Sequence, residues 1–329
     1  MARADLLKKL FSSFKQDDKE MFYTVATEII EDEKKKNHGI LADDLKLILN
    51  GNYQTKKTNM LSSSTPKDKD RDMSLVEIMY PEKYFSDLIV SEEKIAQLEQ
   101  IIKEFNNWDV LVSNGVFPIR RALFYGPPGC GKTLAAQALA GEIGIPMLYV
   151  RFDALISSYL GETASNIRKI FDYAKKDSWL IFFDEFDAIG RSRNDSTEHG
   201  EIKRVVNAFL QQIDNFKGRS LIIAATNFEQ SLDYAIWRRF DETIRFDMPS
   251  SEEKIKLFDL KINRFKGPTH VFEQYLNELE AFSHSDIEKV CQIIMKRCIL
   301  EGRKMYTKND IEYAVEKQKK NVSLRKTQY

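Results

Sequence analysis

One stretch of the chain carries residue types that can hold a nucleotide. Residues 126–133 read Gly-Pro-Pro-Gly-Cys-Gly-Lys-Thr, a complete phosphate-binding loop of the form G-x-x-x-x-G-K-[ST]. Backbone N–H groups of such a loop point at the phosphates, and the positive end of the following helix favours them. Lys132 would reach the β- and γ-phosphates, and the Thr133 hydroxyl would ligate Mg²⁺. The residues expected at the nucleotide are Gly126, Pro127, Pro128, Gly129, Cys130, Gly131, Lys132, Thr133 and Leu134.

A second cluster could carry out hydrolysis. An apolar run at 179–183 ends in Asp184 and Glu185. A buried strand that ends in two carboxylates brings them to the carboxyl edge of a parallel sheet, where the phosphate loop also lies. Asp184 would hold Mg²⁺, directly or through water, and Glu185 would orient and polarise the attacking water. Adjacent acids also occur in solvated turns, so this signal depends on its pairing with the loop.

These two clusters require a sheet and helices that hold them in place. Nearly continuous apolar runs predict strands at 122–125, 147–151, 179–184, 220–224 and 244–246, with helices between them. Such runs are typical of parallel strands that are buried on both faces. The order of elements predicts an α/β fold, a P-loop doubly wound parallel sheet, with a C-terminal all-helical lid domain and a small N-terminal helical module.

Changes in composition along the chain predict the domain organisation. We expect a helical module at 1–50 that docks a substrate or partner or merely packs, a flexible polar linker at 51–74 and the P-loop α/β ATPase-type domain at 75–250. A helical lid follows at 251–318, with helices at 252–265, 272–279, 285–301 and 308–317, and then a frayed basic tail at 319–329. Apolar residues at helical spacing support both helical segments, and small polar residues dominate the linker.

The overall composition excludes several classes of protein. The chain has 329 residues with 43% hydrophobic, enough for about two domains. Its 50 basic residues balance 50 acidic ones, which argues against attachment to nucleic acid or to a membrane by bulk charge. No apolar run approaches the ~18 residues of a membrane span, and the first residues do not resemble a signal peptide. Three cysteines, one of them in the phosphate loop, fit a reducing cytoplasm.

Residues 80–318 resemble the AAA family of ATPases, with several family motifs in order. The resemblance implies ATP hydrolysis with ATP and Mg²⁺ as cofactors. Residues 85–89 are similar to the family segment whose backbone borders the adenine, which implies that Asp87 and Leu88 lie at the base, although the family usually has Gly in place of Ile89. Residues 225–227 resemble the sensor-1 segment, in which Asn227 would hydrogen-bond the lytic water or the γ-phosphate.

Residues 232–241 resemble the family's second region of homology, in which paired arginines reach into the neighbouring subunit's site. Here the pair is Arg238 and Arg239. A planar, permanently charged guanidinium stabilises the negative charge on the transferred phosphoryl group, and such a finger contributes ~10³–10⁵ in rate. The resemblance therefore implies a homo-oligomer, expected to be a hexamer. The alternative is that one or both arginines solvate a helix end.

Residues 153–162 resemble the first pore loop of AAA remodelling machines. Tyr159 would project into a central channel and grip a polypeptide by packing, and Leu160 would support it. The alternative is a tyrosine buried within its own domain. Residues 193–199 resemble a second, polar pore loop. Arg204 and Asn207 resemble positions that relay nucleotide state between subunits, although a charged helix face explains both equally well.

In the lid, residues 282–287 stand where the family has Phe-Ser-Gly-Ala-Asp-Ile. The Gly and Ala that usually lie against adenine are His284 and Ser285 in this chain. His284 could stack on the base, or it could be a half-exposed residue where a helix begins. Ser285 or Asp286 is the expected N-cap of that helix.

Two functions are consistent with these features. The first is ATP-driven remodelling or unfolding of protein substrates by a ring, with the N-terminal helices selecting the substrate. The alternative is an ATP-dependent switch or regulator of a fixed partner protein, such as a protease, without threading. Nucleic-acid remodelling is disfavoured, because the chain is neutral and carries no recognisable nucleic-acid module.

Overall fold

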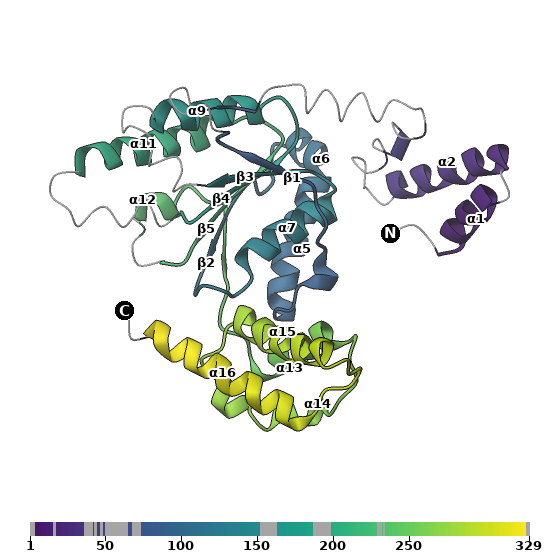
Figure 1. Cartoon of the computed structure of the whole chain (residues 1–329). Coiled ribbons are helices and arrows are strands. Elements are labelled where there is room, and N and C mark those ends of the chain that lie inside the picture. Colours follow the sequence, from purple (N-terminus) through teal and green to yellow (C-terminus); the bar gives the residue numbers. More distant parts are fainter. Residues whose placement is uncertain are drawn as a thin grey trace.

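The computed structural model describes residues 4–15, 18–35, 42, 45–46, 49, 65–67, 74–151, 163–186, 199–228, 232 and 234–326. A six-stranded sheet forms the centre of this part of the chain (Figure 1). The strands lie in the order β1 (Glu77–Met79), β3 (Met147–Arg151), β4 (Leu180–Asp184), β5 (Leu221–Thr226), β2 (Arg121–Tyr125) and β6 (Glu242–Arg245).

Neighbouring strands are parallel except β1, which is antiparallel to β3. The carboxyl ends of β2, β4 and β5 therefore meet at one edge of the sheet. The predicted P-loop α/β fold is confirmed. Strand β1 was missed, because three residues at a sheet edge are too few to show a pattern, and β6 begins two residues earlier than the predicted strand because only Ile244 among its residues is buried.

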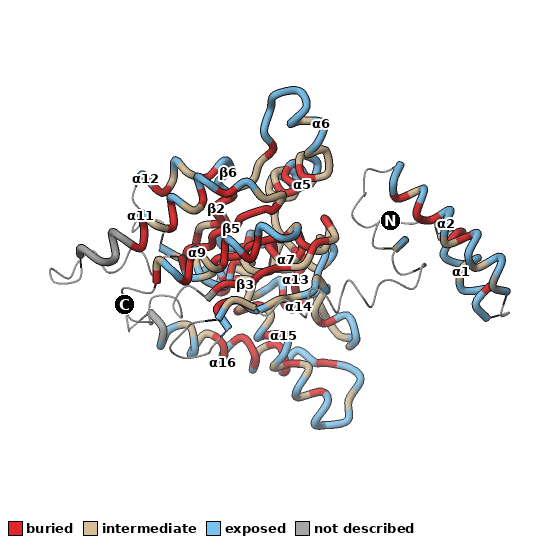
Figure 2. The backbone as a smooth tube through the Cα atoms, turned by 90° about the horizontal axis from the view of Figure 1, so that it is seen from above, coloured by how far each residue is buried: buried red, intermediate tan, exposed pale blue. Residues whose placement is uncertain are grey.

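Helices cover both faces of the sheet (Figure 2). On one face α5 (Glu92–Asn106) and α7 (Lys132–Ile143) pack against residues such as Ala122 and Phe124. On the other face α9 (Thr163–Ala174) and α11 (His199–Asn215) pack against residues such as Leu123. Successive side chains of a strand point to opposite faces, so burial on both sides explains the continuous apolar runs of the strands.

The lid consists of α13 (Ser251–Ile262), α14 (Thr269–Glu273), η4 (Leu276–Leu279), α15 (His284–Leu300) and α16 (Lys308–Lys326), and lies below the sheet in Figure 1. It has its own apolar core, in which the rings of Phe258 and Phe272 stack with centroids 4.1 Å apart. At the other end of the chain, α1 (Ala4–Lys15) and α2 (Lys19–Lys35) pack on each other and lie apart from the sheet and the lid.

The C-terminal helix is longer than predicted, because α16 includes residues 319–326, which we expected to be a frayed tail. Val315, Gln318 and Val322 recur at helical spacing on its inner face, and Gln318 is only 1% exposed. A buried glutamine conceals this periodicity in the sequence. The predicted helix at 272–279 also differs, since α14 and η4 divide it into two short elements.

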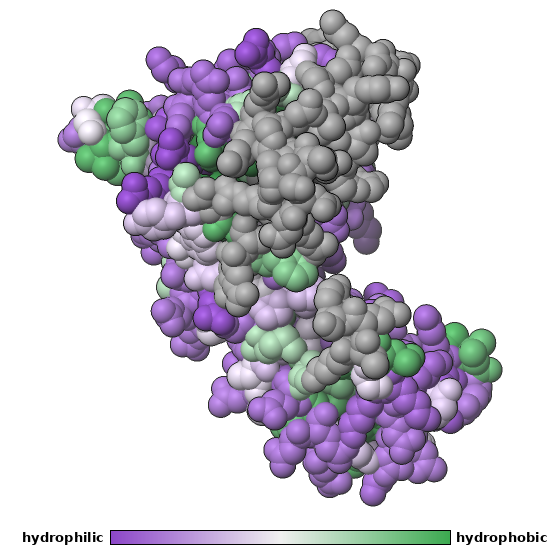
Figure 3. All heavy atoms as spheres, turned by 90° about the vertical axis from the view of Figure 1, so that its left-hand side faces the viewer, coloured by the Kyte–Doolittle hydropathy of each residue, from purple (hydrophilic) through white to green (hydrophobic). Residues whose placement is uncertain are grey.

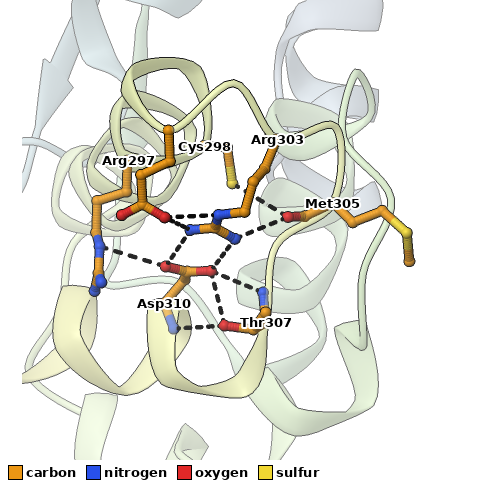
Figure 4. A network of polar contacts seen from close by, with 7 residues as sticks. Arg297, Cys298, Arg303, Met305, Thr307 and Asp310 are labelled. Carbon is orange, nitrogen blue, oxygen red and sulfur yellow. Dashed lines mark hydrogen bonds and ion pairs between the residues drawn. The ribbon is translucent and has the colours of Figure 1, made fainter.

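Asp310 ties the first turn of α16 to the end of α15 (Figure 4). Its carboxylate is 1% exposed and accepts two hydrogen bonds from the Arg303 guanidinium, at 2.8 and 3.0 Å. It also accepts from the backbone N–H of Thr307 at 2.9 Å and pairs with Arg297 Nε at 3.3 Å. Arg303 above all holds the pKa of Asp310 well below the usual carboxyl range, opposed by burial.

We expect Asp310→Asn to reduce the free energy of unfolding at pH 7 by about 2 kcal/mol, because it removes charge-assisted hydrogen bonds from a buried group. The melting temperature of the protein should fall accordingly. A carboxylate whose folded pKa is depressed stabilises the fold above its unfolded pKa of about 3.9. The advantage of the wild type over the variant should therefore be full at pH 5–7 and shrink below about pH 4. Glu301→Gln removes only a half-exposed partner of Arg303 and serves as the control. Equal melting of Asp310→Asn and wild type at pH 7 would contradict the prediction.

Candidate active site

The phosphate loop joins the end of β2 to the start of α7, and close packing fixes two of its glycines. Gly126 has a φ of +130°, and a Cβ there would lie 2.2 Å from the backbone oxygen of Phe246. Gly129 has a φ of +77°, and a Cβ there would lie 2.7 Å from Ser283 Oγ. No other residue type fits these positions without a shift of the backbone or of the lid. The loop is thus held between the residue that follows β6 and the lid.

Lys132 is the first residue of α7, directly after the helix cap Gly131. Its ammonium donates hydrogen bonds to the carbonyl oxygens of Gly126 at 2.7 Å and Pro127 at 2.9 Å, and the residue is 7% exposed. The Lys132 side chain therefore lies across the loop. Phosphate oxygens would replace the two carbonyl oxygens as hydrogen-bond acceptors of its ammonium group. Burial raises the pKa of the neighbouring Cys130 thiol to about 11, although the charge of Lys132 opposes this, so the thiol stays neutral at physiological pH.

Asp184 ends β4 and lies against the first turn of α7. Its Oδ2 atom is 3.4 Å from Thr133 Oγ1, and it accepts a hydrogen bond of 2.8 Å from the hydroxyl of Tyr149 on β3. Hydroxyl and carboxylate oxygens are the hard ligands that Mg²⁺ takes together with water and phosphate. Thr133 and Asp184 therefore fit the ion that the motif implies.

Glu185 adopts a backbone conformation that no other non-glycine residue in the described part of the chain shares, with a φ of 52°. Hydrogen bonds fix the backbone at this residue and at the residue that follows it. Its own N–H donates to Asp184 Oδ1 at 2.9 Å, and the N–H of the fully buried Phe186 donates to the carbonyl of Ala225 at 2.9 Å. The left-handed conformation costs about 1–2 kcal/mol. It leaves the Glu185 side chain exposed at the carboxyl edge of the sheet.

Asn227 follows β5, which lies between β2 and β4 in the sheet. Thr226 pairs with Tyr125, the residue before the phosphate loop, so Asn227 is level with Gly126. The Thr226 hydroxyl accepts a hydrogen bond of 3.1 Å from the N–H of Phe228, which holds the chain in a turn beyond Asn227. The tertiary structure thus brings Asn227 to the same edge as Lys132, Thr133, Asp184 and Glu185.

The predicted base-binding residues lie on two sides of the loop. Leu88 is buried, and its Cδ1 atom would be 3.8 Å from a Cβ at Gly131. The carboxylate of Asp87 accepts a hydrogen bond of 3.1 Å from the N–H of Tyr84, so this side chain caps its own turn, η1 (Phe85–Asp87). From the lid, the N–H of Ser285 donates to the carbonyl of Gly129 at 3.0 Å.

His284 begins α15, and Ser283, not Ser285 or Asp286, is the N-cap of that helix. Both imidazole nitrogens of His284 are shielded from solvent and form no hydrogen bond of ordinary geometry with the residues that the structure describes. Burial lowers the pKa of His284, while Glu253 and the backbone of Ile89 oppose this. A neutral imidazole is therefore held between the lid and the segment that contains Leu88.

Arg238 and Arg239 follow the short helix α12 (Tyr234–Trp237). The Arg238 guanidinium is exposed and lies 4.2 Å from the centroid of the Tyr234 ring. Arg239 has a side chain 37% exposed and pairs through Nε with Asp214 at 3.1 Å. Asp214 also pairs at 3.6 Å with Arg121, the first residue of β2. Because a strand rises ~3.3 Å per residue, that end of β2 lies roughly 13 Å from the phosphate loop.

Several predicted residues lie outside the described part of the chain. These include Tyr159 and Leu160, the second pore loop at 193–198 and the side chain of Arg204. Asn207 is described and is exposed on α11.

Sequence reasoning missed two residues that contact the site. Tyr149 holds Asp184, and Asp214 holds Arg239. Tyr149 looks like one more apolar strand residue, and only the pairing of β3 with β4 brings its hydroxyl to the carboxylate. Asp214 is one of many charges on an amphipathic helix, and nothing in its local pattern marks it.

A mostly parallel sheet with a phosphate loop after β2, two acids at the end of β4 and a polar residue after the intervening β5 defines a P-loop nucleoside triphosphatase. A model of the family described as "ATPase family associated with various cellular activities (AAA)" matches residues 122–248. An uncharacterized AAA family ATPase of Sinorhizobium fredii is 42% identical over 319 residues, which is 96% of this chain and 95% of that protein. The chain belongs to the AAA family of ATPases, and it is an ATP-hydrolysing enzyme.

Two further relatives carry more specific names. A putative 26S proteasome regulatory subunit homolog of Methanocaldococcus jannaschii is 33% identical, over 80% of this chain and 71% of its own length. A proteasome-activating nucleotidase of Saccharolobus solfataricus is also 33% identical, over 77% of this chain and 67% of its own length.

Within the described residues, the structure contains no helix that combines the length and the apolar character needed to cross a membrane.

We expect Tyr149→Phe to raise the Mg²⁺ concentration for half-maximal ATPase activity about three- to tenfold, since it removes one hydrogen bond to a carboxylate and keeps the ring. That ring packs against Phe182 with centroids 5.8 Å apart, so melting should change little. The measurement is a Mg²⁺ titration of ATPase rate at saturating ATP. Tyr173→Phe, on α9 against Trp179, is the matched control. An unchanged Mg²⁺ requirement would show that Tyr149 does not position Asp184.

Proposed function

We propose that this ATPase works as a ring, expected to be a hexamer, and uses ATP to remodel or unfold protein substrates. Arg238 and Arg239 of one subunit complete the active site of the next, and Tyr159 grips the substrate in a central channel. The N-terminal helices select the substrate.

The observation that carries the shared site is the separation of the arginines from their own phosphate loop. Arg239 is paired with Asp214 beside the start of β2, whereas the loop follows the end of the same strand. A separation of roughly 13 Å along β2 exceeds the reach of an arginine side chain. Both side chains reach the surface, where the Arg238 guanidinium lies 4.2 Å from the centroid of the Tyr234 ring. Arg239 would exchange Asp214 for the phosphate of a neighbouring subunit.

Within one subunit, the residues at the carboxyl edge of the sheet divide the work of phosphoryl transfer. Lys132 moves from the loop carbonyls to the β- and γ-phosphates, and Thr133 and Asp184 hold Mg²⁺, which screens the phosphate charge when bound. Glu185 accepts the hydrogen bond of the attacking water and polarises it. Asn227 fixes that water or the γ-phosphate from the neighbouring strand. The strained backbone of Glu185 supports this role, since such strain gathers at functional sites.

The named relatives support a protein as the substrate or partner, because two of them are called proteasome regulators or activators. The N-terminal helices supply a surface suited to a protein. On α1, Phe11 and Phe14 are 72% and 75% exposed. Leu6 and Leu10 of the same helix pack on α2, and the Phe14 ring lies at the border of this contact, with its centroid 6.3 Å from that of Phe22. Three buried cysteines without disulfides support a reducing cytoplasm as the working compartment.

The same names favour one alternative, an ATP-dependent switch or regulator of a fixed partner such as a protease, without threading. Both functions need the shared ATPase site, and they differ in the need for Tyr159.

The shared site is tested by mixing two inactive variants. The Glu185→Gln variant retains both proposed finger arginines but lacks the carboxylate that polarises the attacking water. The Arg239→Ala variant retains an intact nucleotide site but lacks one of the finger arginines. We expect each alone to lose at least about 100-fold in turnover. A one-to-one mixture should recover activity in about a quarter of the sites, because pockets and fingers then meet at random across a heterologous interface.

Arg245→Ala is the control for this experiment, since Arg245 is a 58%-exposed arginine on β6 that pairs with Asp247. Full activity of Arg239→Ala alone, or no recovery in a mixture that assembles, would refute the shared site.

Threading is tested by Tyr159→Ala with ATPase rate and unfolding measured side by side. The unfolding substrate is a fluorescent protein with an unstructured tail. If Tyr159 grips by packing, the alanine variant should lose unfolding by at least about tenfold while it retains ATPase activity, and Tyr159→Phe should behave as the wild type. Unchanged unfolding by the alanine variant would favour the switch over the threading machine.

A further inference from the structure

The first turn of α15 rests directly on the phosphate loop. The N–H of Ser285 donates to the carbonyl of Gly129 at 3.0 Å. Ser283 Oγ is so near that a Cβ on Gly129 would lie only 2.7 Å from it. A displacement of this turn therefore changes the environment of a residue inside the loop.

Three buried polar residues hold that turn, and we call them the Asp286 latch: Ser283, Asp286 and Gln318. Asp286 Oδ2 accepts hydrogen bonds from the N–H of Ser283 at 3.1 Å and from its hydroxyl at 2.8 Å. Asp286 Oδ1 accepts a hydrogen bond of 2.7 Å from Gln318 Nε2, which lies on α16. The three residues are 5%, 4% and 1% exposed.

Gln318 is held so that its amide N–H₂ faces the carboxylate. Its Oε1 atom accepts a hydrogen bond of 3.2 Å from Asn321, one turn further along α16. Next to it, Lys319 forms an ion pair with Glu278 of η4, and Val322 packs on the lid core. The position of Gln318 is therefore set by α16 as a whole.

Loss of the Gln318 amide would leave one oxygen of a buried carboxylate without this donor. A buried charged group that loses a hydrogen-bond partner is strongly disfavoured. If Asp286 turned toward water, its Oδ2 atom would leave the N–H and the hydroxyl of Ser283, and the Ser283 cap would be released. The Ser283–Ser285 segment would leave its place against Gly129.

We propose that Gln318 is a positioning residue for nucleotide binding, which acts through Asp286 and Ser283 to keep the lid seated on the phosphate loop. The inference rests on the role of residues 126–133 as the nucleotide site. It gives the C-terminal helix a part in nucleotide affinity, although α16 supplies no residue to the predicted pocket. By linkage, nucleotide binding must stabilise the seating of α16 to the same extent.

The test uses the full chain and a fluorescent ADP analogue, mant-ADP, with its dissociation constant measured by titration. Gln318→Leu keeps the side-chain volume and removes the donor. We expect mant-ADP to bind about tenfold more weakly, as for the loss of one hydrogen bond to a buried charge. In steady-state assays the KM for ATP should rise by a similar factor and kcat should change less. Lys320→Gln, an exposed change two residues further on α16, should leave both constants unchanged.

A charge variant separates positioning from a purely structural role. Gln318→Glu sets a second carboxylate against Asp286, and we expect it to bind mant-ADP more weakly than Gln318→Leu at pH 7.5. Two buried carboxylates in contact share a proton readily. The loss of mant-ADP affinity relative to the wild type should therefore become smaller as the pH falls from 7.5 to 5.5. A role in lid stability alone would lower the melting temperature of Gln318→Glu but leave its mant-ADP affinity at the wild-type level at both pH values.

An unchanged mant-ADP affinity in Gln318→Leu, whether or not its melting temperature falls, would overturn the proposal. If that variant does not fold, Gln318→Asn, which keeps the amide but is one methylene shorter, replaces it under the same criterion. Lys132→Ala should abolish binding to every version of the chain. If the wild-type protein fails to bind mant-ADP, the nucleotide site itself is refuted. This result is distinct from the one that overturns only the role of Gln318.

Discussion

Close packing of the phosphate loop against both the sheet and the lid is the main constraint on the candidate site. The backbone at Gly126 runs against the carbonyl of Phe246, and the backbone at Gly129 runs against Ser283. These contacts exist only if β2 and β6 are neighbours and if the lid is seated beside the sheet. The phosphate loop therefore contacts both the sheet and the lid, and a displacement of the lid would change the surroundings of the loop.

Around that loop, the side chains predicted to bind the metal and to act in hydrolysis are held by hydrogen bonds and packing from neighbouring residues. Tyr149 and Thr133 fix Asp184, and the buried Phe186 anchors the turn in which Glu185 takes its strained conformation. Preorganisation of this kind reduces the rearrangement needed when charge develops in the transition state. The same principle governs the lid, where a buried glutamine and a buried aspartate orient the first turn of α15.

Opposite ends of one strand carry the two halves of the proposed composite site. The loop follows Tyr125, whereas Arg121 at the other end shares Asp214 with Arg239. If Arg238 and Arg239 are fingers, their place at the other end of β2 from the phosphate loop suits head-to-tail assembly, because a heterologous interface brings different ends together. In such a ring, the exchange of Asp214 for a neighbour's phosphate would report nucleotide state across the interface.

The class of the fold and the local motifs could be predicted from the order of the amino acids alone. A phosphate loop, a strand that ends in Asp184-Glu185 and apolar runs between helical segments each depend on neighbouring residues, so they are visible in a linear pattern. Many residues of the candidate site could be predicted for the same reason, although their roles at the site remain predictions. Element ends were less accurate, as the length of α16 shows.

The residues that hold the candidate site from distant parts of the chain could be identified only in the folded structure. Tyr149, Asp214 and Gln318 act through partners 35, 25 and 32 positions away in the chain. A tyrosine in a strand, an aspartate on a charged helix and a glutamine near a basic end each have an ordinary local interpretation. Hydrogen bonds between such residues depend on strand register and helix packing, which the global fold sets and no local pattern encodes.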